Sequence, residues 1–127
     1  AANNPFMAYT HVRLTAIDKD ARGDYQAEVC VDLHPESKNL HGAVHGGLLY
    51  GLADCAAGVA SRCDGNDYVT QSAHINFLSN VTCGTVTARA TVVRRGRRIV
   101  VLRVEICNEA GKLLADCTVD MMRMERK

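Results

Sequence analysis

The sequence lacks several features that mark common classes of protein. It has no tryptophan, two phenylalanines and four tyrosines, and its net charge is only +1. A near-neutral chain with few aromatic residues gives no case for binding nucleic acid or a membrane surface. No apolar run approaches the roughly 20 residues of a membrane span. The opening AANNPFMAYT also lacks the basic and apolar regions of a signal peptide. We therefore expect a soluble, cytoplasmic protein.

Metal-binding and disulfide patterns are also missing. The chain has six cysteines, and none of them forms a C-x-x-C pair, which argues against zinc-ribbon and thioredoxin-type sites. Most lie within apolar runs, where a reduced cysteine acts as a small hydrophobic residue. His41 and His45 are four residues apart, but a zinc site needs further ligands that the pattern does not supply. We expect reduced cysteines, no disulfide scaffold and no metal.

What remains is the composition of one globular domain covering residues 1–127, with 47% apolar and 23% charged residues. Apolar residues alternate with polar ones in six segments, as in half-buried strands. These segments are Thr10–Ile17, Asp24–Leu33, Tyr68–Leu78, Thr85–Arg94, Arg98–Cys107 and Leu113–Arg123. The last four are separated by short connections, which predicts an antiparallel meander. One helix interrupts the strands, so the fold class is α+β.

The predicted helix follows Gly47 and ends near the turn cluster at 64–67. One side carries an apolar arc at helical spacing, consisting of Leu48, Leu49, Leu52, Ala56, Val59 and Ala60. The other side carries Gly47, Tyr50, Gly51, Asp54 and Gly58. Each glycine lowers helix propensity by about 1 kcal/mol relative to alanine. We expect the sheet to cover the apolar arc and a second subunit to approach the glycines.

Asp54 is the only formal charge between His41 and Ser61. An ionised carboxylate is costly to bury unless it is paired or hydrogen-bonded. It is either a structural acid that meets a partner or solvent, or a catalytic base or nucleophile in a partly desolvated cleft.

Gly46 and Gly47 fall where the helix begins, and the first backbone N–H groups of a helix have no intrahelical partner. Such an N–H can polarise a carbonyl oxygen, aided by the helix dipole. Alternatively, the glycines only permit the turn into the helix. Their position two helical turns before Asp54 favours the chemical interpretation.

The stretch RRGRR at Arg94–Arg98 places four cations around one glycine. A solvated turn explains such a stretch, and so does a site for a phosphate-bearing ligand, because guanidinium groups bind phosphate oxygens in pairs.

The spacing N-x-x-G-x-x-HGG-x-x-x-x-L-x-D, which runs from Asn39 to Asp54, resembles the hotdog-fold acyl-CoA thioesterases. It is most similar to the branch with the phenylacetate-pathway (PaaI-like) and 4-hydroxybenzoyl-CoA thioesterases. The similarity continues through VTQSAHINFL, GTVTARATVVRRGRR and EICNEAGKLLADCTV, and so covers nearly all of the chain past residue 30. The implied fold is a curled antiparallel sheet around one long central helix.

The resemblance also implies catalytic roles. The Gly46 N–H would polarise the thioester carbonyl, and Asp54 would act as general base on water or as nucleophile. Asn39 would position the thioester or the attacking water, and Thr70 matches a hydroxyl position beside the carboxylate. The family's sites lie at a dimer interface, where Asp54 would face Asn39 and Gly46 of the other subunit. Dimers of the family commonly pair into tetramers.

For substrate binding, the resemblance implies a supporting role for His45 and Gly47. The arginines of the RRGRR turn, Arg94, Arg95, Arg97 and Arg98, could meet the phosphates of coenzyme A. No cofactor is needed for thioester hydrolysis. The alternatives are a hotdog hydratase or dehydratase, for which no His–acid motif is present, and a non-catalytic acyl-CoA-binding or regulatory domain. The acyl group, whether aryl or aliphatic, stays open, as does delivery by a carrier protein.

Overall fold

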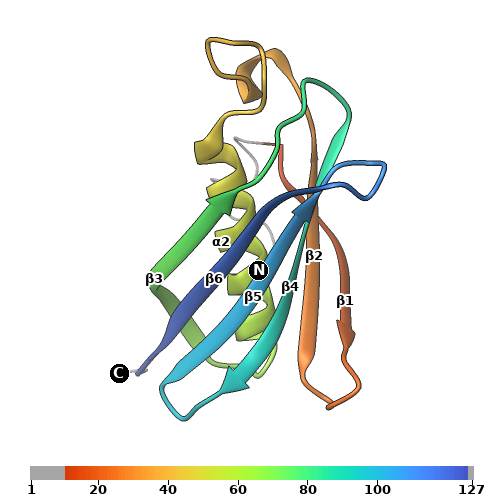
Figure 1. The fold of residues 1–127 in the computed structure, drawn as a ribbon. Helices are drawn as coiled ribbons and strands as arrows, with labels where there is room; N and C mark the ends of the chain where they lie inside the picture. The colour runs from red at the N-terminus through yellow and green to blue at the C-terminus, as the bar shows by residue number, and fades with distance from the viewer. Residues whose placement is uncertain (1–10, 126–127) are drawn as a thin grey trace.

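The computed structural model describes residues 11–125, which form one long helix and a six-stranded antiparallel sheet (Figure 1). The strands are β1 (Arg13–Lys19), β2 (Tyr25–Asp32), β3 (Asp67–Phe77), β4 (Thr85–Arg95), β5 (Ile99–Cys107) and β6 (Leu113–Met124). The helix α2 spans Gly46–Arg62, after a short 3-10 turn, η1, at Pro35–Ser37. The predicted α+β class, with one central helix against a curled antiparallel sheet, is confirmed. Thr10, the predicted start of the first strand, lies outside the described residues.

The strand order is β1-β2-β4-β5-β6-β3, so the predicted four-strand meander is wrong for β3. β4, β5 and β6 are sequential neighbours, but β3 pairs with β6 at the far edge, with Phe77 opposite Ala115. The reason is that the connection after β3 crosses the end of the sheet instead of turning back. Its Val81 carbonyl accepts from the Val44 N–H at 2.9 Å, and its Gly84 carbonyl accepts from the Leu33 N–H at 2.9 Å. This crossing delivers β4 beside β2.

The core lies between α2 and the concave face of the sheet. β4 and β5 alternate buried and more exposed residues along most of their length, as the sequence predicts for half-buried strands. The largest fully buried side chains are Leu49, Leu52, Leu102, Ile106, Leu114, Val29, Val31, Val44, Val86, Val92 and Val100. Each buried leucine stabilises the fold by about 1.5–3 kcal/mol relative to an exposed one. The predicted apolar arc of the helix is therefore the surface that fixes α2 against the sheet.

β3 is an edge strand, and most of its residues are exposed. Its concave face nonetheless meets α2, because Tyr68 is buried in the core and Thr70 contacts Asp54. The edge strand and the helix face beside it therefore carry polar groups that the core does not cover. Within residues 11–125, no helix is both long enough and apolar enough to cross a membrane, and no cluster of potential metal ligands is found.

Candidate active site

The N-terminus of α2 leaves one backbone donor free. His45 is the N-cap, and its Nδ1 accepts from the Gly47 N–H at 2.9 Å. Its carbonyl accepts from the N–H groups of Leu48 at 3.0 Å and Leu49 at 3.3 Å. Among the described residues, the Gly46 N–H has no hydrogen-bond acceptor. Gly46 can therefore offer its N–H to a ligand, whereas the N–H of Gly47 is already used by the cap.

The loop before the helix is held by Asn39. Its Oδ1 accepts from the His41 N–H at 2.9 Å and from the Ala43 N–H at 3.3 Å. The His45 N–H donates to the Ser37 carbonyl at 2.8 Å, which fixes the point where the helix begins. Because Oδ1 is the acceptor in both bonds, the Asn39 amide nitrogen is its remaining donor. Within the described part of the chain this nitrogen has no acceptor, so it can also meet a ligand.

Asp54 lies two turns into α2 and is half-buried. Its Oδ1 accepts a hydrogen bond from the Thr70 hydroxyl on β3. The same hydroxyl lies 3.5 Å from the sulfur of Met121 on β6. Thr70 thus orients the carboxylate, while its second oxygen has no hydrogen-bond donor among residues 11–125. This arrangement leaves one oxygen free to take a proton or to attack.

The neighbouring thiol is not a competing nucleophile. Burial raises the pKa of Cys55 to about 11, and the negative charge of Asp54 adds to the increase. A thiol with this pKa is protonated at neutral pH, and only the thiolate is strongly nucleophilic. On this part of α2, the carboxylate of Asp54 is therefore a better candidate for a reactive group than the thiol of Cys55.

An aromatic side chain lies close to the free N–H of Gly46. Phe77, at the end of β3, lies against the helix start, and its ring is 3.3 Å from where a Cβ on Gly46 would be. Tyr50, Phe77 and Leu78 are 40%, 54% and 57% exposed, so they are surface residues and not core. From the sequence alone, these three residues could line an acyl pocket or belong to the core, and their exposure excludes the core.

The glycines of α2 have close neighbours within the same chain. A Cβ on Gly47 would lie 3.0 Å from the His45 ring, and a Cβ on Gly58 would lie 2.8 Å from the Arg62 guanidinium. Contacts within the same chain therefore explain Gly47 and Gly58, and a second subunit is not needed to account for them.

The distance between Gly46 and Asp54 along α2 limits how these two groups can contact one substrate. Eight residues at 1.5 Å per residue place them roughly 12 Å apart along the helix axis. A carbonyl-polarising donor and a base must each lie within about 3 Å of the reacting atoms. This separation is long for two groups that contact the same carbonyl directly.

The four arginines of the RRGRR turn fall into two groups. Arg95 points inward, and all five of its donors are used. It forms ion pairs with Asp24 at 3.0 Å and Asp64 at 2.9 Å, and it donates to the carbonyls of Ala60 and Ser61 and to the Tyr68 hydroxyl. A cation that binds the last carbonyls of a helix also complements its dipole. Arg95 thus has no donor left for a phosphate and secures the end of α2.

Replacing Arg95 by leucine is expected to lower the free energy of unfolding by about 2–3 kcal/mol, because it leaves Asp24 and Asp64 without their cation. Burial alone would raise the pKa of each carboxyl. Hydrogen bonds, from Arg95 at Asp24 and from the Tyr68 hydroxyl at Asp64, together with the charge of Arg95, lower both below the ordinary 3.8. Groups with a lowered folded-state pKa stabilise the fold above the unfolded value and lose that stabilisation as the pH falls through the folded value.

Urea unfolding between pH 3 and pH 7 measures this effect. The difference between wild type and Arg95→Leu should shrink below about pH 4. Arg103→Leu is the control, since Arg103 pairs with Asp116 at the surface with 52% of its side chain exposed. That control should change stability by less than about 1 kcal/mol. An Arg95→Leu variant as stable as the control would show that the inward network does not hold the helix end.

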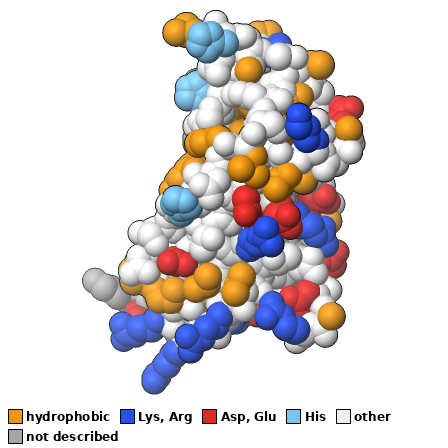
Figure 2. All heavy atoms as spheres, in the orientation of Figure 1, with side chains coloured by type: hydrophobic (Ala, Val, Ile, Leu, Met, Phe, Trp, Pro, Cys, Tyr) orange, Lys and Arg blue, Asp and Glu red, His pale blue; other side chains and the backbone are white. Residues whose placement is uncertain are grey.

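Arg94, Arg97 and Arg98 form the second group, and all three side chains are exposed. Figure 2 shows Lys and Arg side chains gathered at the end of the molecule that carries the β4–β5 turn. Gly96 is required there, since a Cβ would lie 2.8 Å from the Ile99 carbonyl oxygen that accepts from its own N–H. Two cavities of about 480 and 490 Å³ flank the turn, and Arg97 and Arg98 line both.

The sequence of this chain matches a known protein family. A family profile described as "Thioesterase superfamily" matches residues 41–115, more than half of the chain. The chain belongs to the thioesterase superfamily. The matched segment includes Gly46, Asp54, Thr70 and the RRGRR turn, and Asn39 lies two residues before it.

Relatives within the superfamily agree with this assignment. The acyl-coenzyme A thioesterase PaaI of Escherichia coli is 34% identical over 90 residues, which are 70% of this chain and 64% of that protein. A relative from Saccharolobus solfataricus is 35% identical over 90 residues, 69% of this chain and 64% of its own. These matches span less than two thirds of the length of either curated relative.

Solved structures share the whole described fold. The structure of Escherichia coli PaaI superposes with a TM-score of 0.88 at 27% identity, covering 97% of this chain and 86% of that one. A Thermus thermophilus protein superposes with a TM-score of 0.86 at 33% identity, covering 96% and 99%. The fold of this thioesterase-superfamily chain is thus the hotdog fold.

Proposed function

We propose that this protein hydrolyses small aryl- or acyl-CoA thioesters to the free acid and coenzyme A. The observation that carries the proposal is a carboxylate oriented by Thr70 on the same helix whose start presents the unpaired Gly46 N–H. Membership of the thioesterase superfamily supports it, as does the description of the Escherichia coli relative as an acyl-coenzyme A thioesterase.

In the proposed reaction, the Gly46 N–H donates to the thioester oxygen and stabilises the negative charge that develops there. The Asn39 amide is a second donor for the thioester or the attacking water. As a general base, the free oxygen of Asp54 takes a proton from water, whose oxygen forms the new bond to the carbonyl carbon. The carbon–sulfur bond then breaks, and coenzyme A leaves as a thiolate that receives a proton.

Asp54 can also attack the carbonyl carbon directly. The carbon–sulfur bond would break, coenzyme A would leave as a thiolate that receives a proton, and the product on Asp54 would be a mixed anhydride, which water opens to the free acid and the original carboxylate. Single-turnover hydrolysis in ¹⁸O-labelled water distinguishes the routes. Direct attack by water labels the product acid in the first turnover, whereas opening of the anhydride at the aspartyl carbonyl labels Asp54.

The proposed site is shared between two copies of the chain. In a two-fold symmetric dimer each copy can supply Asp54 to one site and Gly46 to the other. This arrangement removes the roughly 12 Å separation along one helix. The exposed edge of β3 and the exposed Tyr50 and Phe77 support an interface on this side of the molecule.

Release of free coenzyme A from a panel of aryl- and aliphatic acyl-CoAs tests the proposal. Hydrolysis of at least one member, above the rate in buffer, is expected. Binding of the same acyl-CoAs without any release of coenzyme A would contradict the proposal and favour a non-catalytic acyl-CoA-binding protein.

A further inference from the structure

The first half of α2 has a stretch that the rest of the described chain leaves uncovered. Its accessible residues are Gly46, Gly47, Tyr50 and Asp54, whereas residues 55–61 are all buried. Gly46, Tyr50 and Asp54 are spaced four residues apart, so they follow one another along the same face of the helix. Tyr50 is at the centre of this stretch, has its largest side chain and is 40% exposed.

A site shared between two copies determines how their helices can run. In a two-fold dimer with parallel helices, each residue lies level with its own copy, and the roughly 12 Å between Gly46 and Asp54 along the axis remains. Antiparallel helices remove this separation, because Gly46 of one copy then lies level with Asp54 of the other. Tyr50 is halfway between these two positions. The two-fold axis therefore passes beside Tyr50, which faces its own copy.

Symmetry also limits the distance between the two tyrosines. The vector between the two Tyr50 Cα atoms is close to the average of the two vectors that join Gly46 of each copy to Asp54 of the other. The two Tyr50 Cα atoms are therefore about as close together as Gly46 and Asp54 in one shared site. Packed helices have axes about 8–10 Å apart, and two tyrosine rings can meet across such a gap.

The two shared sites lie on either side of this tyrosine pair. Each site is four residues, or roughly 6 Å, from Tyr50 along the helix. A bound thioester has a small acyl group on one side of the carbonyl and the much larger coenzyme A on the other. The short space between the two sites cannot hold two coenzyme A groups. The coenzyme A groups must therefore leave away from the axis, so that the acyl groups point toward Tyr50.

We infer that Tyr50 and the partner's Tyr50 meet at the two-fold axis and form the end wall of both acyl pockets. The inference rests on the proposed function, because its geometry follows from a site that Gly46 and Asp54 share between two copies. The wall leaves each acyl group roughly 6 Å along the helix, which suits a short chain or a single aromatic ring. Tyr50 is thus a specificity-determining residue that limits acyl length.

Cross-linking at position 50 tests the pairing without any substrate. Tyr50→Cys is made together with Cys83→Ser, which removes the exposed native cysteine, and is treated with a short bismaleimide. A covalent dimer is expected. Arg62→Cys in the same background is the control on α2, because antiparallel helices that meet at Tyr50 hold its two copies roughly 36 Å apart. No dimer from Tyr50→Cys, or equal yields from both variants, would overturn the pairing.

Hydrolysis of straight-chain acyl-CoAs of increasing length tests the end wall. The wild type should lose kcat/KM as the chain outgrows the pocket. Tyr50→Ala should raise kcat/KM for octanoyl-CoA relative to butyryl-CoA about tenfold, since each methylene that gains room adds roughly fourfold in binding. Tyr50→Phe keeps the ring and should keep the wild-type limit on length. An unchanged length profile in Tyr50→Ala would show that the wall is wrong while the proposed hydrolysis stands.

Binding measurements separate this inference from the proposed function. The same acyl-CoA series is titrated by calorimetry into Asp54→Asn and into the double variant Asp54→Asn/Tyr50→Ala, with melting temperatures as a check on folding. The double variant should bind octanoyl-CoA about tenfold more tightly relative to butyryl-CoA than Asp54→Asn does. If this shift is found but the wild type hydrolyses none of the series, the proposed function fails and the tyrosine wall stands. Equal length dependence in the two proteins would contradict the wall.

Discussion

Replacing Asp54 by asparagine is expected to lower kcat by about 10³-fold while leaving the fold intact. General-base catalysis contributes roughly 10²- to 10⁴-fold, and an amide can neither take a proton from water nor attack as a carboxylate does. Asparagine can still accept the hydrogen bond from Thr70, so the local geometry is retained. Some activity should survive, because the Gly46 N–H still polarises the carbonyl. The measurement is steady-state release of coenzyme A from the best member of the panel.

A matched control is available on the other face of the sheet. Asp120 accepts from the Ser72 hydroxyl at 3.1 Å, much as Asp54 accepts from Thr70, yet it lies away from α2. Asp120→Asn should keep kcat within about twofold of the wild type, since surface substitutions away from special features have small effects. Equal activities of Asp54→Asn and wild type would rule out Asp54 as base or nucleophile, whatever the reaction proves to be.

Removing the Gly46 N–H is the second change with a large expected effect. Gly46→Pro deletes the donor, whereas Gly46→Ala keeps it and adds a similar Cβ. Proline is well tolerated at the first residue of a helix. The preceding residue, His45, has φ −70° and ψ 132°, which is the extended conformation that a following proline requires. The pair of variants therefore separates the N–H from the bulk of the side chain.

Gly46→Pro is expected to lower kcat about 10²- to 10³-fold relative to Gly46→Ala, the usual cost of losing one donor to a developing oxyanion. Both variants place a Cβ 3.3 Å from the Phe77 ring, so any shift of that half-exposed ring is common to both. The comparison uses kcat and KM for the same acyl-CoA, with melting temperatures as a check on folding. If the two variants have the same kcat, the Gly46 N–H does not stabilise the transition state.

Local patterns in the sequence predict much of the fold. The arc from Leu48 to Ala60 predicts the buried face of α2, and the alternation along β4 and β5 predicts which residues enter the core. The position of β3 could not be predicted in this way. Its connection to β4 is short enough for a hairpin, but contacts of Val81 and Gly84 with distant residues carry it across the sheet. Strand partners depend on such long-range contacts, and periodicity does not report them.

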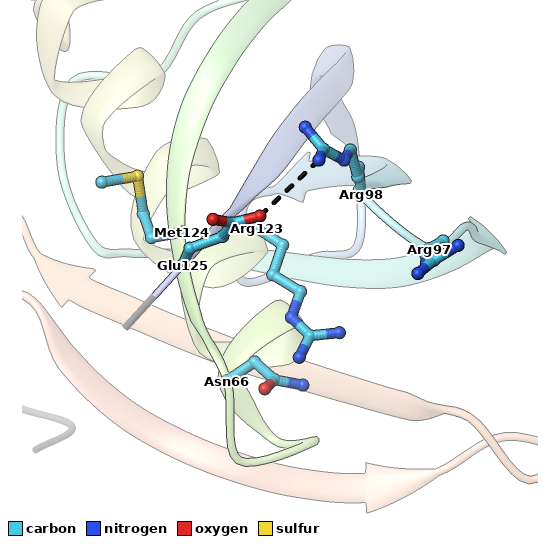
Figure 3. Close-up of a pocket in the computed structure, with 6 residues that line it drawn as sticks. All are labelled: Asn66, Arg97, Arg98, Arg123, Met124 and Glu125. Atoms are coloured by element: carbon cyan, nitrogen blue, oxygen red, sulfur yellow. Dashed lines mark ion pairs between the residues drawn. The ribbon is translucent and has the colours of Figure 1, made fainter. Parts of the chain in front are cut away.

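The candidate site also has some features that local sequence predicts and others that depend on long-range contacts. The lone charge of Asp54 and the glycines at the helix start are local signals, and the structure places both where the sequence predicts. The RRGRR stretch has no local signal that separates Arg95, which binds the end of α2, from Arg97, which faces solvent. No nearby sequence pattern predicts that Arg123 lies beside this turn, because the pairing of β6 with β3 and the bond from its N–H to the Arg98 carbonyl place it there (Figure 3).

The central claim is that Asp54 of one subunit and Gly46 of another act on the same thioester. Mixing Asp54→Asn and Gly46→Pro subunits, followed by dissociation and random reassociation, tests it most directly. Half of the resulting dimers would be mixed, and each mixed dimer would hold one intact site and one site with both defects. The account predicts recovery of about a quarter of the wild-type activity, far above either variant alone. Activity that stays at the average of the two separate variants would contradict it.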